Sequence, residues 1–249
     1  MPSSLFLLPH QDDEYFAAPV IARELTEGRQ IHCIFLTNGA TALASADTRN
    51  EESRQALERM GVPAKNLEFL GTAQDVADGQ LVQRLESIHQ FISPKIASLG
   101  VDRIYCPAWE GGHQDHDAAC ALGTVLARVH RVSGWEYSLY QGQSTRGKFF
   151  TVMTPVTTRA GAISEHWSAR TGLQMALACR SYRSQWRSWV GLLGPALLAF
   201  VVQRELWLNP VELESLKQRP HEGALLYERY GRTTYAQVAS HVAAYLGQH

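Results

Sequence analysis

Short hydrophobic runs alternate with amphipathic stretches through the first half of the chain. Four apolar runs have the length and composition of buried strands: residues 5–8, 31–36, 67–70 and 103–108. The stretches that follow them have helical spacing and helix-end signals: residues 14–28, a segment from Asp47 or Thr48 to Met60, 81–99 and 115–129. Four such repeats predict an α/β, Rossmann-like fold, with a mostly parallel sheet, helices on both faces, right-handed crossovers and an active site at the C-terminal edge of the strands.

The last third of the chain is less regular. Residues 137–140 and 149–152 have the composition of further strands, and residues 165–185 have that of a helix. Residues 189–202 carry no charge and are interrupted by Gly194 and Pro195. Because this segment is short for a membrane span, we predict a buried helix that starts near Pro195, and no integral membrane span.

Composition and length are those of an ordinary globular protein. With 249 residues, 45% hydrophobic and 19% charged, the chain can bury a large core, and we expect a single domain over residues 1–249. The segment before residue 10 has no basic region and too short an apolar run for a signal peptide, which favours a cytoplasmic protein. The cysteines show no C-x-x-C pairing and indicate neither disulfides nor a cysteine-ligated zinc: Cys33, Cys106, Cys120 and Cys179.

Charge is nearly balanced overall but clustered locally. The net charge of -1 argues against a nucleic-acid partner. Arginines and tryptophans gather just before and within the apolar segment: Arg180, Arg183, Arg187, Trp186 and Trp189. They could form a basic binding surface, but with this net charge a solvated helix face is the favoured interpretation.

One histidine and three carboxylates follow the first predicted strand. Residues 9–14 read PHQDDE, and Pro9 prevents simple continuation of the strand, so His10, Asp12 and Asp13 should emerge at its C-terminal end. Ligands bind at this edge of open α/β sheets. His10 and Asp13 can bring an imidazole and a carboxylate to one cation, while Asp12 remains available for proton transfer. Taken alone, the pattern fits a solvated acidic turn equally well.

A second cluster follows the fourth predicted strand. Residues 110–117 read EGGHQDHD, in which His113 and His116 lie three apart with Asp115 between them. Histidines at this spacing share one face of a helix. Catalytic zinc sites use three protein ligands and leave a position for water. His10, Asp13 and one of the two histidines would complete such a set, leaving the other histidine for acid–base chemistry.

Together these clusters resemble the HPDDE and HPDH motifs of the PIG-L/LmbE family of zinc-dependent deacetylases. The resemblance covers roughly three quarters of the chain. It extends to TNG at residues 37–39, Arg49-x-x-Glu52, Met60-Gly61-Val62, the LG and DG pairs of residues 70–79, and Ser184-Gln185. Gln11 and Gln114 replace the usual prolines at positions that supply no ligand, so we expect altered loop stiffness and an intact site.

The resemblance implies a hydrolase that removes an N-acetyl group from an N-acetylglucosamine-type sugar conjugate, a small molecule. Zinc, or another divalent transition metal, would be held by His10, Asp13 and His116. Asp12 would take a proton from water, and protonated His113 would stabilise the oxyanion and protonate the leaving amine. Asp115 would hold the imidazole of His113 or cap its helix.

Arg49 and an acidic loop residue are the expected substrate contacts. A cation in the first turn of a helix opposes the helix dipole, so the position of Arg49 is compatible with a role in binding an anion or a polar substrate, while an exposed, salt-bridged arginine remains the default interpretation. The resemblance likewise implies that an arginine at this position contacts substrate. It also implies an acidic residue in the loop of residues 71–79, for which Asp75 and Asp78 are both candidates, although a helix cap explains Asp78 equally well.

Three other functions fit less well. A non-catalytic, metal-containing sugar-binding or regulatory protein of the same fold would need a structural site, which normally has four protein ligands, whereas Asp12 and His113 are left over here. A nucleotide-binding protein is disfavoured because no G-x-G-x-x-G follows residues 5–8 and no G-x-x-x-x-G-K-[ST] occurs. Phosphate hydrolysis by two metals lacks a second clear ligand set. No motif selects the group attached to the sugar or an oligomeric state.

Overall fold

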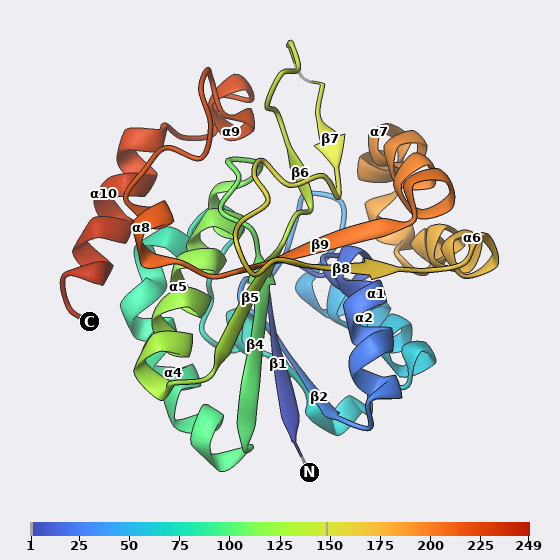
Figure 1. Cartoon of the computed structure of the whole chain (residues 1–249), viewed down its shortest axis with the longest axis horizontal. Helices are drawn as coiled ribbons and strands as arrows, with labels where there is room; N and C mark the ends of the chain where they lie inside the picture. Colours follow the sequence, from blue (N-terminus) through green and yellow to red (C-terminus); the bar gives the residue numbers. More distant parts are fainter. Residues whose placement is uncertain (1, 148) are drawn as a thin grey trace.

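A mostly parallel sheet forms the centre of the protein (Figure 1). The computed structural model describes residues 2–147 and 149–249. Within these residues, seven strands form the sheet in the order β3-β2-β1-β4-β5-β9-β8. They are β1 (Ser3–Leu8), β2 (Gln30–Phe35), β3 (Leu67–Phe69), β4 (Val101–Pro107), β5 (Ser133–Tyr137), β8 (Ile163–His166) and β9 (Glu205–Pro210). Strands β1 to β5 pair in parallel, and β8 and β9 pair antiparallel, which confirms the predicted α/β, mostly parallel architecture.

Strand β1 lies in the middle of the sheet and is buried throughout. Leu5 and Leu7 face one hydrophobic core, and Phe6 and Leu8 face the other. This explains why the strand is an unbroken apolar run, since a strand covered on both faces has no polar side. The pairing of β1 with both β2 and β4 then places the loops after these three strands at one edge.

Helices cover both faces of the sheet, as predicted (Figure 1). One face is covered by α4 (Leu85–Ser98), α5 (Gln114–His130) and α10 (Tyr235–Leu246). The other is covered by α1 (Glu14–Thr26), α2 (Ala46–Met60), α6 (Ala169–Leu177) and α7 (Trp186–Leu197). The shorter helices are α3 (Leu70–Ala73), α8 (Leu213–Leu216) and α9 (Leu226–Arg229), and a two-stranded hairpin joins β6 (Tyr140–Gln141) to β7 (Thr151–Val152).

Several helix boundaries differ from the sequence prediction. Ser45, rather than Asp47 or Thr48, caps α2: its hydroxyl accepts a hydrogen bond from the N–H of Thr48, so the helix begins earlier than expected. The stretch predicted as one helix over residues 165–185 is divided. Its start belongs to β8, because it pairs with β9, and helix α6 begins only after the cap Ser168.

The apolar segment near Pro195 also differs from its prediction. Helix α7 begins at Trp186, has Pro195 in its interior and continues into a π-helical turn, Leu198–Gln203. Only one face of it is buried, because Trp189 packs in the core while Val190 is 75% exposed. The side chain of Arg187 lies outside the described residues. Among those residues, the structure contains no helix long and apolar enough to cross a membrane.

Candidate active site

Gln11 connects the loop after β1 to the loop after β2. Its side-chain amide donates to the carbonyl oxygens of Thr37 (3.2 Å) and Asn38 (3.4 Å) and to Oδ1 of Asn50 (2.7 Å). Gly39 allows this approach, since its φ is +62° and a Cβ there would lie 1.9 Å from Oε1 of Gln11. Side-chain hydrogen bonds therefore fix the loop at the position where the HPDDE motif has its proline.

Asp12 has a backbone conformation that is rare outside glycine, with φ 135°. Its N–H donates to Oε2 of Glu14 at 3.0 Å, and Oε1 of Glu14 accepts from the hydroxyl of Tyr182 at 3.0 Å. The Asp12 carboxylate points toward Arg49, whose Nη2 lies 3.5 Å away. Burial raises the pKa of Asp12 to about 7, although Arg49 opposes this shift.

Three potential metal ligands converge from the loop after β1 and the first turn of α5. Oδ1 of Asp13 lies 3.2 Å from Nε2 of His116, and Oδ2 of Asp13 lies 3.4 Å from Nδ1 of His10. One ligand atom from each of the three residues falls within 4.8 Å of the others. Burial opposes ionisation of Asp13, but the imidazoles of His116 and His10 hold its pKa well below the ordinary value.

The ring nitrogens of His116 show that this cluster fits a cation. Both are buried and lack a hydrogen-bond partner among the described residues, although Asp13 is close to one of them. A buried polar atom without a partner is costly. A divalent cation bound by His10, Asp13 and His116 would satisfy Nε2 of His116, and this imidazole–carboxylate set is one that zinc accepts.

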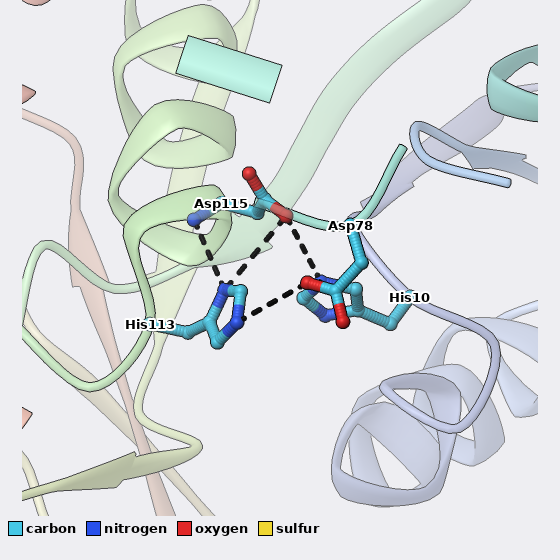
Figure 2. Close-up of side chains that lie close together, drawn as sticks. All are labelled: His10, Asp78, His113 and Asp115. Carbon is cyan, nitrogen blue, oxygen red and sulfur yellow. Dashed lines mark hydrogen bonds and ion pairs between the residues drawn. The ribbon is translucent and has the colours of Figure 1, made fainter. Parts of the chain in front are cut away.

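Asp115 contacts His10 more closely than His113 (Figure 2). Its carboxylate is fully buried, and Oδ2 lies 3.1 Å from Nε2 of His10 but 3.8 Å from Nδ1 of His113. The same carboxylate accepts hydrogen bonds from the N–H groups of Gly79 (2.6 Å) and Leu81 (3.0 Å). Asp115 therefore orients the candidate ligand His10 and ties it to the loop before α4.

His113 caps helix α5 and is held neutral. Its Nδ1 accepts a hydrogen bond from the N–H of Asp115 at 3.2 Å, while Nε2 faces Oδ1 of Asp78 at 3.3 Å and Nη1 of Arg232. Burial, followed by the positive charges of His10 and His116, lowers the pKa of His113 well below the ordinary value. The structure therefore favours a neutral imidazole at this position over the protonated acid expected from the sequence.

About the first half of the chain matches a known protein family. Residues 5–127 match the family model PIG-L, described as GlcNAc-PI de-N-acetylase. The chain belongs to the PIG-L family. No curated protein matches it.

Solved structures with a similar fold include two deacetylases and a hydratase. A deacetylase of teicoplanin biosynthesis has 14% identity and a TM-score of 0.63, covering 86% of this PIG-L chain and 100% of its own. The N,N'-diacetylchitobiose deacetylase of Pyrococcus horikoshii has 15% identity and a TM-score of 0.57, covering 84% and 83%. The 4-carboxy-2-hydroxymuconate hydratase of Pseudomonas putida has 15% identity and a TM-score of 0.50, covering 82% and 86%. At these identities the likeness establishes the fold alone.

The guanidinium of Arg49 in this PIG-L protein donates hydrogen bonds to the backbone carbonyls of two loops. The side chain is buried, and it donates from Nη1 to the carbonyl of Gly39 (2.6 Å) and from Nη2 to that of Gln11 (2.7 Å). Arg49 thus joins the loops after β1 and β2 beside Asp12, and it also lines the candidate active-site cavity. The substrate contact expected of Arg49 stays a prediction.

Asp78, rather than Asp75, lies among the histidines (Figure 2). Its Oδ1 is 3.4 Å from Nε2 of His10 and 3.3 Å from Nε2 of His113, and its side chain is 35% exposed. Burial opposes ionisation, but the two histidines and Arg232 hold the pKa of Asp78 well below the ordinary value. Asp75 is exposed and does not line the cavity.

The remaining motifs of the PIG-L resemblance contact one another. The carboxylate of Glu52 accepts hydrogen bonds from the N–H (2.8 Å) and the hydroxyl (2.6 Å) of Ser184. Gln185 donates to the carbonyl of Gln11 at 3.3 Å and lines the cavity. The segment before α7 is therefore fixed against the loop that carries Asp12.

A cavity of about 390 Å³ opens over the histidines and carboxylates. Its lining combines polar with aromatic and apolar side chains: His10, Asp12, Asp78, His113 and Arg232, and Tyr140, Phe150, Leu192 and Leu226. Arg232, whose Nη1 contacts Nε2 of His113, is not among the site residues predicted from the sequence. No motif marks this arginine, because the chain brings it to the site from far along the sequence, after α9.

Proposed function

We propose that this PIG-L protein is a metal-dependent amide hydrolase that removes an N-acetyl group from an amino sugar of the N-acetylglucosamine type. The observation that carries the proposal is the buried, unpartnered His116 beside Asp13 and His10, next to a cavity that also contains the Asp12 carboxylate. A purely structural site would have no use for Asp12, which is not among the three candidate ligands.

His10, Asp13 and His116 would hold the cation, for which we propose zinc or another divalent transition metal. When bound, such a cation supplies Lewis acidity: it lowers the pKa of a coordinated water toward ~7 and polarises a carbonyl oxygen. Asp115 keeps the ring of His10 oriented through its contact with Nε2, which leaves Nδ1 directed toward Asp13.

Asp12 would act first as a base and then as an acid. Its raised pKa of about 7 lets it take a proton from the attacking water and return that proton to the leaving nitrogen. Water then adds to the amide carbonyl, the C–N bond breaks, and acetate and a free amine leave. Since His113 is held neutral, we propose that it carries its proton on Nε2 and donates a hydrogen bond from there to the developing oxyanion, without a change in its protonation.

The lining of the cavity and the relatives support this substrate class. A cavity lined by both polar and apolar side chains suits a sugar ring that carries hydroxyls and an acetamido group. Residues from position 10 to position 232 line it, which supports one functional domain over residues 1–249. Proteins of similar fold include deacetylases of teicoplanin biosynthesis and of diacetylchitobiose.

Acetate release from the purified, metal-loaded protein tests this proposal. We expect turnover of N-acetylglucosaminides and none of simple N-acetyl amino acids, with activity lost on chelation and restored by zinc. Faster cleavage of N-acetyl amino acids than of every acetylated amino sugar would exclude the proposed substrate class. Hydrolysis that survives complete metal removal would exclude the proposed mechanism.

A further inference from the structure

Helix α7 and the π-helical turn after it present a row of apolar side chains to solvent. We define this α7 apolar row as Val190, Leu193, Leu197, Leu198 and Val202. On α7 itself the members recur at the spacing of one helical face, with exposed fractions between 36% and 75%. Helix α6 adds two further exposed leucines, Leu173 and Leu177.

The α7 apolar row is not the core-facing side of the helix. The core is contacted by other side chains of the same segment, among them Trp189, Ala196 and Phe200, which are buried. The segment is therefore hydrophobic on both sides, and one side has no cover within the described residues. A helix that is apolar all round normally has all of its surface covered, and a contiguous exposed apolar patch marks an interaction site.

Charge within the segment that carries this row is one-sided. Residues 167–204 include five arginines and neither aspartate nor glutamate, in a chain whose net charge is -1. Arg170, Arg180 and Arg183 are exposed, and the described residues offer none of them an ion pair. The surface therefore combines an apolar row with unneutralised positive charge.

This combination selects an anionic lipid surface as the partner. A second copy of the chain would bring two arginine clusters into the same interface, which is unfavourable, and a nucleic acid would leave the apolar row uncovered. At a bilayer, the apolar side chains enter the boundary between headgroups and acyl chains, while the arginines remain at the level of the phosphates. We propose that α6, α7 and the π-helical turn dock this protein reversibly on anionic membranes.

The α7 apolar row lies next to the rim of the active-site cavity. Gly191 and Leu192, on the same helix, line the active-site cavity, so the row is continuous with its rim. Figure 1 shows α7 at the end of the molecule where the hairpin of β6 and β7 projects. Docking through the row would hold the cavity mouth close to the lipid surface.

Vesicle flotation of the full-length protein tests the proposal directly. We expect binding to phosphatidylcholine vesicles that contain phosphatidylglycerol, little binding to phosphatidylcholine alone, and weakening as salt is raised. Val190→Glu combined with Leu198→Glu should reduce binding at least ~10-fold, because charges replace side chains that enter the bilayer boundary. Val129→Glu, at an exposed position of α5, is the matched control and should bind like the parent.

A second pair of variants tests the charge without touching the apolar row. Arg170→Gln and Arg180→Gln should each weaken binding to anionic vesicles roughly fivefold, whereas Arg128→Gln on α5 should not. Equal binding to neutral and anionic vesicles, no binding to either, or full binding by the Val190/Leu198 variant would overturn the proposal. So would self-association of the parent in the absence of lipid that the Val190/Leu198 variant abolishes, since the row would then be an interface between copies.

Discussion

Replacing Asp115 by asparagine tests whether this buried carboxylate acts on the metal site through His10. The carboxylate accepts the N–H groups of Gly79 and Leu81 and contacts Nε2 of His10. Asparagine has one acceptor oxygen and a donor amide, so whichever way it is turned, at least one of these donors faces another donor.

The expected effect has two parts. A buried N–H left without an acceptor costs ~1–3 kcal/mol, which for a chain of this length lowers Tm by roughly 3–9 °C. Loss of the partner that orients a metal-binding histidine lowers metal affinity by ~10–100-fold. The measurements are thermal unfolding of the metal-free protein and zinc titration against a competing chelator, each compared with Asp75→Asn in the exposed part of the same loop.

The two readouts separate an orienting role from a structural one. A fall in Tm with zinc affinity within about threefold of the parent would refute the reasoning, because Asp115 would then only hold the loop of Gly79 and Leu81. Unchanged values in both measurements would contradict the hydrogen bonds themselves. Asp75→Asn should leave both values unchanged, since that side chain is exposed and outside the cavity.

Four further predictions concern individual side chains of the site. Asp12→Asn should retain zinc and lose ~10²–10⁴ in kcat, whereas Asp13→Ala should lose zinc, and equal loss of metal in both would contradict their different roles. His116→Ala should impair zinc binding, whereas His113→Ala should keep zinc and lower kcat. Metal titration of the two variants tests this, and the opposite pattern would reverse the two roles. Because Asp12 must be ionised to act as a base, kcat/KM should rise as pH rises through about 7. The same pH profile in Asp12→Asn would refute this assignment. His113 should cause no fall in kcat/KM at higher pH, because its pKa is lowered. Arg49→Ala should raise KM for the sugar and also lower kcat, with zinc content unchanged, because Arg49 supports the loop of Asp12 and also lines the cavity. An effect on KM alone would indicate that Arg49 only contacts the substrate.

The parallel half of the fold could be predicted because its strands are buried on both faces and therefore read as unbroken apolar runs. Strands β8 and β9 lie at the antiparallel end of the sheet, and their sequences, ISEH and ELWLNP, mix polar and apolar residues without a clear period. Pairing with a neighbouring strand, which is not a local property, decides that these segments are strands.

The candidate ligands could be named from the sequence because they come from two short motifs at strand ends. Their partners could not be named, because those partners are set by tertiary contacts. The choice between Asp75 and Asp78 depends on how the loop after α3 turns. The contact of Asp115 with His10 depends on how the first turn of α5 approaches the loop after β1, 105 positions away in the sequence. Arg232 reaches His113 from a segment with no motif at all.

The neighbours Asp12 and Asp13 show how different surroundings assign different chemistry to identical side chains. Asp13 is buried and Asp12 is half-buried, so desolvation alone would raise both pKa values. The two carboxylates have different neighbours: Asp13 faces two imidazoles, which keep it ionised as a ligand requires, whereas the charge of Arg49, 3.5 Å from Asp12, does not offset desolvation and leaves the pKa of Asp12 near 7. The backbone of Asp12, with φ 135°, is strained, and the contacts that hold it are the N–H bond to Glu14 and the brace from Arg49 to the adjoining carbonyl. The acid–base function of Asp12 therefore depends on the side chains that maintain the turn as much as on its own carboxylate.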